Sequence, residues 1–172
     1  MKIIKSIFQR MKGDSLARKM TEVRREKEYS HMHTVKSGVV FWIAGVGEQP
    51  GLETIREKFP EVKMDKVCFL PANYQGLQVD DVVYVKAEDV GFGGKIMNDK
   101  LFHVLEKPYD LLIDLTRESN VLVDYVLKNS QAKCKAGMEK EGFEADIVLK
   151  GISDPVVFIG ELAKLLSDLK EY

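Results

Sequence analysis

Short apolar runs and segments of helical periodicity alternate along the chain from residue 36 onward. The run Gly38–Ala44 is continuous and rich in β-branched and aromatic residues, which is typical of a strand buried on both faces. Asp154 followed by Pro155 is the clearest helix start in the sequence. The pattern predicts strands at 38–44, 66–70, 81–86, 111–115, 133–136 and 145–149, and helices at 50–59, at 98–107, after Ser119 and from Pro155 to Leu169.

Strands that alternate with helices predict a mainly parallel sheet covered on both faces. The fold class we expect is α/β, a three-layer Rossmann-like domain with a mostly parallel sheet of five or six strands. The interval between the last two predicted strands is too short for a helix. We therefore expect a hairpin or an antiparallel edge between residues 133 and 149.

The first 33 residues differ from the rest in pattern. Apolar residues recur there at near-helical spacing among basic ones, which predicts a basic amphipathic helix. Gly13 and the following Asp-Ser predict a break and a second helix through about Tyr29. We divide the chain into an N-terminal basic helical segment, 1–33, and an α/β domain, 36–172. The apolar residues of the first helix are Ile3, Ile4, Ile7, Phe8 and Met11.

The chain has 172 residues, of which 45% are apolar and 31% charged, and its formal net charge is −1. This composition excludes a disordered chain and argues against a dedicated nucleic-acid-binding protein, which is usually strongly basic. Residues 1–33 hold nine basic and four acidic side chains, a net +5 that leaves −6 for the rest. Lys5 and Arg10 interrupt any secretory apolar core, and no run is long enough to span a membrane, so we expect a cytoplasmic protein.

Several roles remain open for the basic N-terminal helix. It can pack on the domain, or it can mediate self-association or contact with a protein partner. It can also bind an anionic surface, either a membrane or nucleic acid. A short amphipathic helix binds membranes weakly without a second anchor, so peripheral membrane contact is an alternative rather than the leading expectation.

Loops are expected to gather at the carboxyl ends of the strands, where ligands bind in open α/β sheets. The loop 44–51 places Gly45 and Gly47 as the first two glycines of a dinucleotide-binding turn, with Pro50 at the third position. The second strand leads to Asn73 without an acid, so the ribose-binding carboxylate is missing. A tight strand-to-helix turn is the simpler explanation, and binding of an anion or nucleotide at the helix start is the alternative.

The loop after the fourth strand holds the most polar chemistry. Asp114 lies within an apolar run, so its carboxylate must find donors or shift its pKa. Arg117 and the N–H groups of the next helix are available donors, and Thr116 and Ser119 lie in the same loop. Asp114 either ties the loop to the helix or takes part in binding or acid–base chemistry.

The remaining candidates point to structure more than to chemistry. The glycine-rich segment 91–95 lacks the residues of a nucleotide-binding P-loop and is expected to be a flexible connection. Cys68 and Cys134 lie in predicted strands and are expected to be buried thiols. His31 and His33 lack the further ligands that a metal site needs, so we expect no metal, and the sequence identifies no cofactor.

The segment from residue 109 to residue 137 resembles two groups of proteins. Its strand Tyr-Asp-Leu-Leu-Ile-Asp-Leu, the following helix and Gln-Ala-Lys-Cys-Lys-Ala-Gly look like an uncharacterised bacterial domain-of-unknown-function family of about this length. That likeness covers most of the chain and implies no catalytic residue. About 30 residues are also similar to the N-terminal half of heptosyltransferase-like glycosyltransferases. This implies only a shared sheet design, because the nucleotide-sugar half would need another domain.

These observations favour an uncharacterised cytoplasmic α/β protein that acts as a non-catalytic binding or interaction module. The alternative is a protein or enzyme that binds an anionic or nucleotide-like small molecule at the carboxyl ends of the strands. The residues of that site would be Gly45, Gly47, Asn73, Asp114, Thr116, Arg117 and Ser119.

Overall fold

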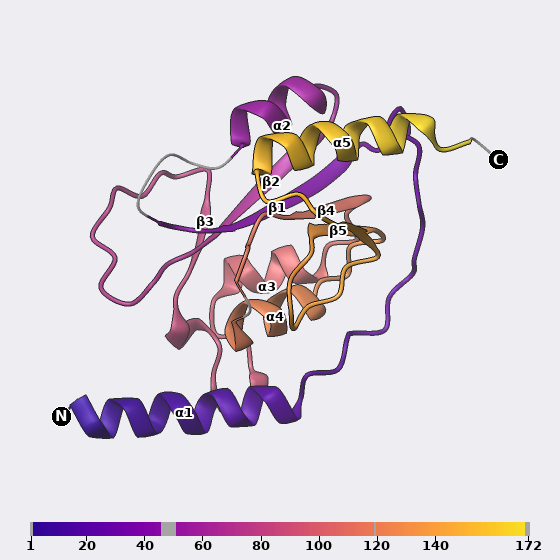
Figure 1. Cartoon of the computed structure of the whole chain (residues 1–172). Coiled ribbons are helices and arrows are strands. Elements are labelled where there is room, and N and C mark those ends of the chain that lie inside the picture. The colour runs from indigo at the N-terminus through magenta and orange to yellow at the C-terminus, as the bar shows by residue number, and fades with distance from the viewer. Residues whose placement is uncertain (1, 46–50, 119, 171–172) are drawn as a thin grey trace.

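A computed structural model describes residues 2–45, 51–118 and 120–170, except for the side chains of residues 2–6, 8 and 9. It contains a six-stranded sheet in the order β3-β2-β1-β4-β5-β6 (Figure 1). Every neighbouring pair of strands is parallel, which confirms the expected Rossmann-like α/β fold. The strands are β1 (Ser37–Ile43), β2 (Lys63–Phe69), β3 (Val83–Val85), β4 (Leu111–Asp114), β5 (Lys135–Met138) and β6 (Ile147–Leu149).

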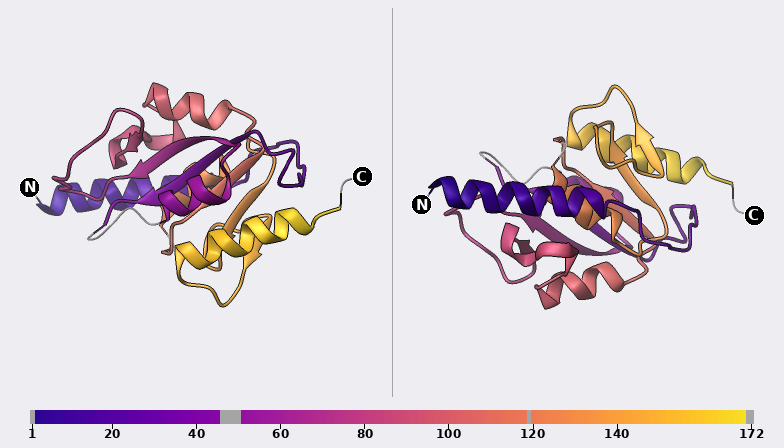
Figure 2. Two further views of the ribbon diagram at one scale, coloured as in Figure 1. Left: turned by 90° about the horizontal axis from the view of Figure 1, so that it is seen from above. Right: turned by 90° about the horizontal axis from the view of Figure 1, so that it is seen from below.

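Helices cover both faces of the sheet. The helices on one face are α2 (Leu52–Lys58) and α5 (Pro155–Asp168), and those on the other are α3 (Asp99–Glu106) and α4 (Val121–Lys128). Two short 3₁₀ turns, η1 (Ala87–Asp89) and η2 (Phe92–Gly94), precede α3. The first helix, α1 (Lys2–Arg18), packs outside α4 and η2 and adds a partial further layer (Figure 2).

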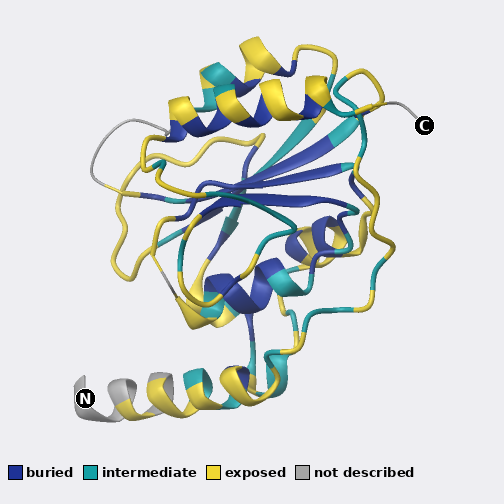
Figure 3. Cartoon of the chain, turned by 45° about the vertical axis from the view of Figure 1, so that its right-hand side comes forward, coloured by how far each residue is buried: buried dark blue, intermediate teal, exposed yellow. Residues whose placement is uncertain are grey.

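Alternate residues of each central strand fill two separate cores. Val40 and Trp42 of β1 pack with α2 and α5, while Val39 and Phe41 pack with α3 and α4. All four are at most 3% exposed. Burial on both faces follows from the continuous apolar run, because each side of the sheet is covered by helices (Figure 3).

The prediction of an antiparallel edge between residues 133 and 149 is wrong. β5 and β6 pair in parallel, with Ala136 opposite Ile147. The connection, residues 139–146, has no helix, yet eight extended residues reach about 26 Å whereas β5 spans only about 13 Å. Phe143 of this connection is buried in the core of the α3 and α4 face, so the segment itself covers the sheet where a crossover helix would lie.

The predicted second helix ending near Tyr29 is also wrong. α1 continues through Gly13 to Arg18, and residues 19–36, here called the N-terminal strap, form no helix. Backbone N–H groups of the strap instead donate to distant carbonyls, from Val23 to Lys128 and from Met32 to Leu166. Tertiary contacts therefore override the local helical pattern. The division of the chain near residues 33–36 falls at the end of this strap and remains a prediction.

Candidate functional site

The carboxyl end of β4 holds a buried group of polar side chains, here called the carboxyl-end cluster: Asp114, Thr116, Asp124 and Lys140. Lys140 Nζ lies 2.9 Å from Asp114 Oδ2 and 3.6 Å from Asp124 Oδ1. Thr116 donates its N–H and its hydroxyl to Asp114 Oδ1, at 2.9 and 2.6 Å. The side chains of Asp114 and Lys140 are 1% and 2% exposed, so these contacts take place away from water.

Three parts of the chain bring this cluster together. Asp114 ends β4 opposite Gly137 of β5, where an added Cβ would lie 3.4 Å from the Asp114 Cβ, so glycine keeps this approach open. Lys140 follows on the connection from β5 to β6. Asp124 lies in the first turns of α4, whose start is capped by the Asn120 side chain through two backbone N–H groups. The cluster therefore joins β4, α4 and the connection.

Burial dominates the electrostatics of the cluster. It raises the pKa of Asp114, and the Lys140 ammonium and the Thr116 hydrogen bonds oppose part of that shift. A buried charge is tolerated only when it is paired, and Lys140 serves two carboxylates at once. The geometry is that of a structural clamp, because the charged groups bind one another.

The structure unites only part of the predicted site. Two of its residues, Asp114 and Thr116, are in contact. Arg117 is exposed and forms no hydrogen bond or ion pair with another described residue, so Lys140, and not Arg117, pairs with Asp114. The N–H groups at the start of α4 are bound by Asn120 rather than by Asp114. Ser119, which was also predicted for this site, lies outside the described residues.

The predicted glycine and asparagine positions follow turn geometry. Gly45 follows β1, the strand that pairs with β4, and is exposed. A Cβ added at Gly45 would meet no described atom within 4 Å. Asn73 lies in an exposed turn after β2 with a φ of 65°, a conformation that asparagine tolerates. No hydrogen bond joins it to the other predicted site residues that the structure describes. Gly47 and Pro50 lie outside the described residues.

The glycine-rich segment 91–95 connects two helices. The Gly93 N–H donates to the Ser15 hydroxyl of α1 at 3.2 Å, and the Tyr125 hydroxyl of α4 donates to the Gly94 carbonyl at 2.8 Å. The N–H groups of Gly91 and Gly94 are bonded within the segment. The donors that would cradle a phosphate are thus used inside the protein.

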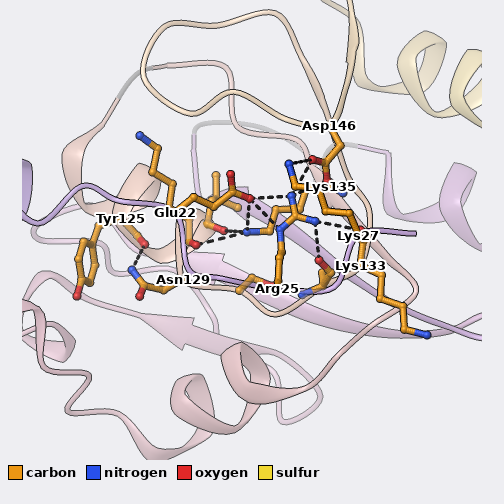
Figure 4. Close-up of polar contacts among 12 residues, drawn as sticks. Glu22, Arg25, Lys27, Tyr125, Asn129, Lys133, Lys135 and Asp146 are labelled. Carbon is orange, nitrogen blue, oxygen red and sulfur yellow. Dashed lines mark hydrogen bonds and ion pairs between the residues drawn. The ribbon is translucent and has the colours of Figure 1, made fainter. Parts of the chain in front are cut away.

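A second polar centre lies at the amino ends of β5 and β6, where the N-terminal strap crosses the sheet (Figure 4). Arg25 donates to both carboxylate oxygens of Asp146 at 2.7 Å and to Glu22 at 2.8 Å. It also donates to the carbonyls of Ala132 and Lys133, each at 3.0 Å. Its side chain is only 2% exposed. These bonds use the full donor capacity of the guanidinium and fix the strap to the sheet.

Lys135 lies at the bottom of this second centre with a fully buried side chain. Its Nζ donates to the Leu127 carbonyl at 2.8 Å and lies 3.5 Å from Glu22 Oε1. Burial lowers the pKa of Lys135 to about 8, and the Arg25 charge adds to this effect. Burial alone would raise the pKa of Asp146, but hydrogen bonds from the Lys135 N–H, Arg25 and Lys27 together lower it.

A cavity of about 460 Å³ opens beside the second centre. Its charged lining is of both signs, and several of these groups are already paired, such as Lys27 with Asp146 at 3.1 Å. Nothing in this lining selects a ligand of one charge. Its side chains include Glu22, Lys27, Tyr29, Lys128, Glu144 and Asp146.

Cysteine and histidine provide no reactive centre in the described part of the chain. Cys68 and Cys134 are buried as predicted, and burial raises their pKa to about 11 and about 12, which disfavours the reactive thiolate. The rings of His31 and His33 stack with centroids 5.0 Å apart. Within the described residues, no group of three or more His, Cys, Asp or Glu is arranged to hold a metal ion.

The sequence analysis missed Asp124 and Lys140 of the carboxyl-end cluster and the charged side chains of the second centre: Glu22, Arg25, Lys27, Lys135 and Asp146. A signal existed for Lys140, since it follows a strand whose carboxyl end lies beside β4 in a parallel sheet. Because we expected a hairpin or an antiparallel edge between residues 133 and 149, Lys140 was not placed near the carboxyl end of β4. Arg25 and Lys135 were harder to find, because Asp146 lies 121 positions from Arg25 and Glu22 lies far from Lys135 in sequence.

Comparison with known proteins gives a match to a family whose function is unknown. A protein-family model described as a family of unknown function (DUF6913) matches residues 12–169. No curated protein and no solved structure matches the chain. The similarity to heptosyltransferase-like glycosyltransferases is supported by none of these comparisons. Among the described helices, none has the length and apolar content that crossing a bilayer requires.

Proposed function

Because the chain belongs to this family of unknown function, DUF6913, we propose a function from its own surface: it is a non-catalytic interaction module that presents α1 to a partner. One observation carries the proposal. Ile7 and Met11 lie one turn apart on α1 and are 52% and 56% exposed. Neighbouring apolar side chains kept in water on one helix are typical of a surface that a partner covers.

The attachment of α1 supports this role. Leu16 is buried in the core beneath it, Ser15 binds Gly93, and Lys12 Nζ donates to the Ala87 carbonyl. These contacts fix the carboxyl-terminal half of the helix on the domain. The exposed residues lie on the remaining side: Ile7, Arg10, Met11, Asp14, Ala17 and Arg18. α1 is thus held in place with one side turned toward solvent.

Most of the buried charged side chains lie in the two polar centres and bind one another there, which supports a structural role for them. In the carboxyl-end cluster, Lys140 is bound by Asp114 and Thr116. In the second centre, Arg25 is bound by Glu22 and Asp146. Both sets of charges bind one another within the fold, whereas the exposed side chains of α1 are free to meet a partner.

The double variant Ile7→Asp/Met11→Asp tests the proposal by thermal melting and sedimentation equilibrium. We expect a melting temperature within about 2 °C of the wild type, because exposed substitutions change stability by about 0.5 kcal/mol. Leu16→Ala on the same helix is the matched buried control and should lower it by at least about 4 °C. A similar fall in the double variant would show that the apolar side chains pack within the protein and would refute the proposal.

A second candidate function is binding of an anionic or nucleotide-like small molecule at the carboxyl ends of β1 and β4. The strand order places the topological switch point between these strands, and exposed Gly45 and Arg117 lie there. Ligand at about 100 times its dissociation constant stabilises by about 2.7 kcal/mol, a readily measured thermal shift. A shift with nucleotides or sugar phosphates that is lost in Arg117→Ala, but kept in Arg56→Ala on α2, would favour this function.

A further inference from the structure

We propose that the partner of α1 is the surface of an anionic lipid bilayer. This inference rests on the proposed function and names the chemistry of the partner. The helix carries five basic residues and one acidic residue, a net charge of +4. A basic helix that also exposes apolar side chains is attracted to anionic headgroups by its charge and can insert those side chains at the headgroup level. The charged residues are Lys2, Lys5, Arg10, Lys12 and Arg18, with Asp14 as the acid.

The distribution of charge over the molecule gives this contact an orientation. Since the whole chain has a net charge of −1, the residues outside α1 sum to −5. A negatively charged membrane therefore attracts α1 and repels the rest of the protein. The body would be held away from the lipid while α1 faces it.

The position of α1 suits a flat partner. It lies across the lower face of the molecule, outside the layer of α3 and α4 (Figures 1 and 2). A helix of 17 residues is about 26 Å long. Ile7 and Met11 can enter the headgroup region while exposed Arg10 and Arg18 pair with lipid phosphates. Because apolar and basic side chains are exposed together, lipid fits this surface better than nucleic acid, whose phosphates would use only the charges.

Vesicle flotation with the full-length protein tests the inference. The probes are neutral phosphatidylcholine vesicles and vesicles with roughly 30% phosphatidylglycerol, each at about 0.05 M and about 0.5 M salt. We expect binding to the anionic vesicles at low salt, a loss of at least about tenfold at high salt, and no binding to the neutral ones. One basic residue at an anionic surface contributes about fivefold in affinity, so Arg10→Glu/Arg18→Glu should weaken binding by more than about 25-fold.

Matched variants separate α1 from the rest of the surface. Ile7→Asp/Met11→Asp should abolish flotation without lowering the melting temperature. Val157→Asp/Lys164→Glu changes an exposed apolar and an exposed basic residue of α5, on the opposite side of the sheet, and should float like the wild type.

Three outcomes would overturn the lipid inference: no flotation of the wild type, equal flotation with neutral vesicles, or α1 variants that float normally. If flotation fails but Ile7→Asp/Met11→Asp abolishes self-association or oligonucleotide binding of the wild type, the lipid is the wrong partner and the interaction function stands. If the double variant instead melts well below the wild type, the interaction function itself is wrong. The two failures are therefore distinguishable.

Discussion

Arg25 donates to both carboxylate oxygens of Asp146 at 2.7 Å across 121 positions of the sequence. The pair joins the N-terminal strap to the residue that precedes β6. Both side chains are at most 5% exposed, so the bond forms away from water. The guanidinium nitrogen Nη2 makes both bonds, and a buried ion pair of this kind is costly to break from one side because the other charge is left unpaired.

Arg25→Ala should lower the free energy of unfolding by about 3–5 kcal/mol, because it leaves the Asp146 carboxylate buried without its guanidinium. Arg25→Lys should lower the free energy of unfolding by less, because lysine keeps the positive charge although it lacks the planar donor geometry of arginine. Urea denaturation measures both. Arg24, the exposed neighbour, gives the control. The free energy of unfolding of Arg24→Ala should lie within about 0.5 kcal/mol of that of the wild type. Wild-type stability of Arg25→Ala would mean that the strap is not held by this residue.

Lys135 should make the free energy of unfolding depend on pH in the alkaline range. Its pKa is lowered from 10.5 to about 8, so between these values the unfolded chain binds more protons than the folded one. The contribution of Lys135 to stability is therefore fully present above about pH 10.5 and is lost as the pH falls toward 8.

Denaturation of the wild type and Lys135→Met from pH 7 to pH 10.5 isolates this effect, since other titrating groups are common to both. The stability of the wild type relative to the variant should rise by up to about 3 kcal/mol over that range. Lys164→Met, which removes an exposed lysine of α5, is measured alongside as the matched substitution. A relative stability that stays constant would contradict a lowered pKa for Lys135.

Removal of Lys140 should destabilise the carboxyl-end cluster in a pH-dependent way. Lys140→Met leaves Asp114 buried without its cation, and we expect a loss of about 3–5 kcal/mol at pH 7. The loss should shrink as the pH falls, because burial already raises the pKa of Asp114 and protonation removes the unpaired charge.

A double-mutant cycle with Asp114→Asn tests the pairing directly. The double variant should be more stable than the sum of the two single losses implies, with a coupling of at least about 1 kcal/mol. Additive losses would show that Lys140 and Asp114 act independently.

Two glycines should respond in opposite directions to substitution by alanine. Gly94 has a φ of 83°, and a Cβ there would lie 2.0 Å from the Tyr125 hydroxyl oxygen, so Gly94→Ala should destabilise by more than about 1 kcal/mol. Gly13 lies inside α1, where a Cβ meets nothing within 4 Å, so Gly13→Ala should stabilise by about 0.5–1 kcal/mol. Thermal melting measures both. Equal effects would contradict the conformational difference between the two sites.

Most of the fold could be predicted from local patterns. The apolar run of β1 and the Asp154–Pro155 start of α5 specify their elements without distant help, and the Asp154 side chain caps α5 as expected. The connection between β5 and β6 was predicted wrongly, because loop length suggested a hairpin. Its parallel path depends on Phe143 being buried against the sheet, which no local pattern reveals.

The candidate site was only half predictable. Asp114 stood out because a carboxylate in an apolar strand needs partners, and Thr116 was close in sequence. Lys140 could not be chosen over Arg117 from spacing alone, since only the register of β5 beside β4 brings it near. The role of Arg25 could not be predicted for the same reason, because Asp146 lies 121 positions away in sequence.

The N-terminal strap has a consequence for synthesis on the ribosome. The strap is made early, but it bonds Lys128, Lys133, Asp146 and Leu166, which are all made late. It must therefore wait without its partners while nearly the whole chain is translated. A nascent or prematurely ended chain that lacks α5 cannot place the strap fully. An early segment of the chain is then among the last to reach its folded position, because its contacts are complete only after Leu166 has been made.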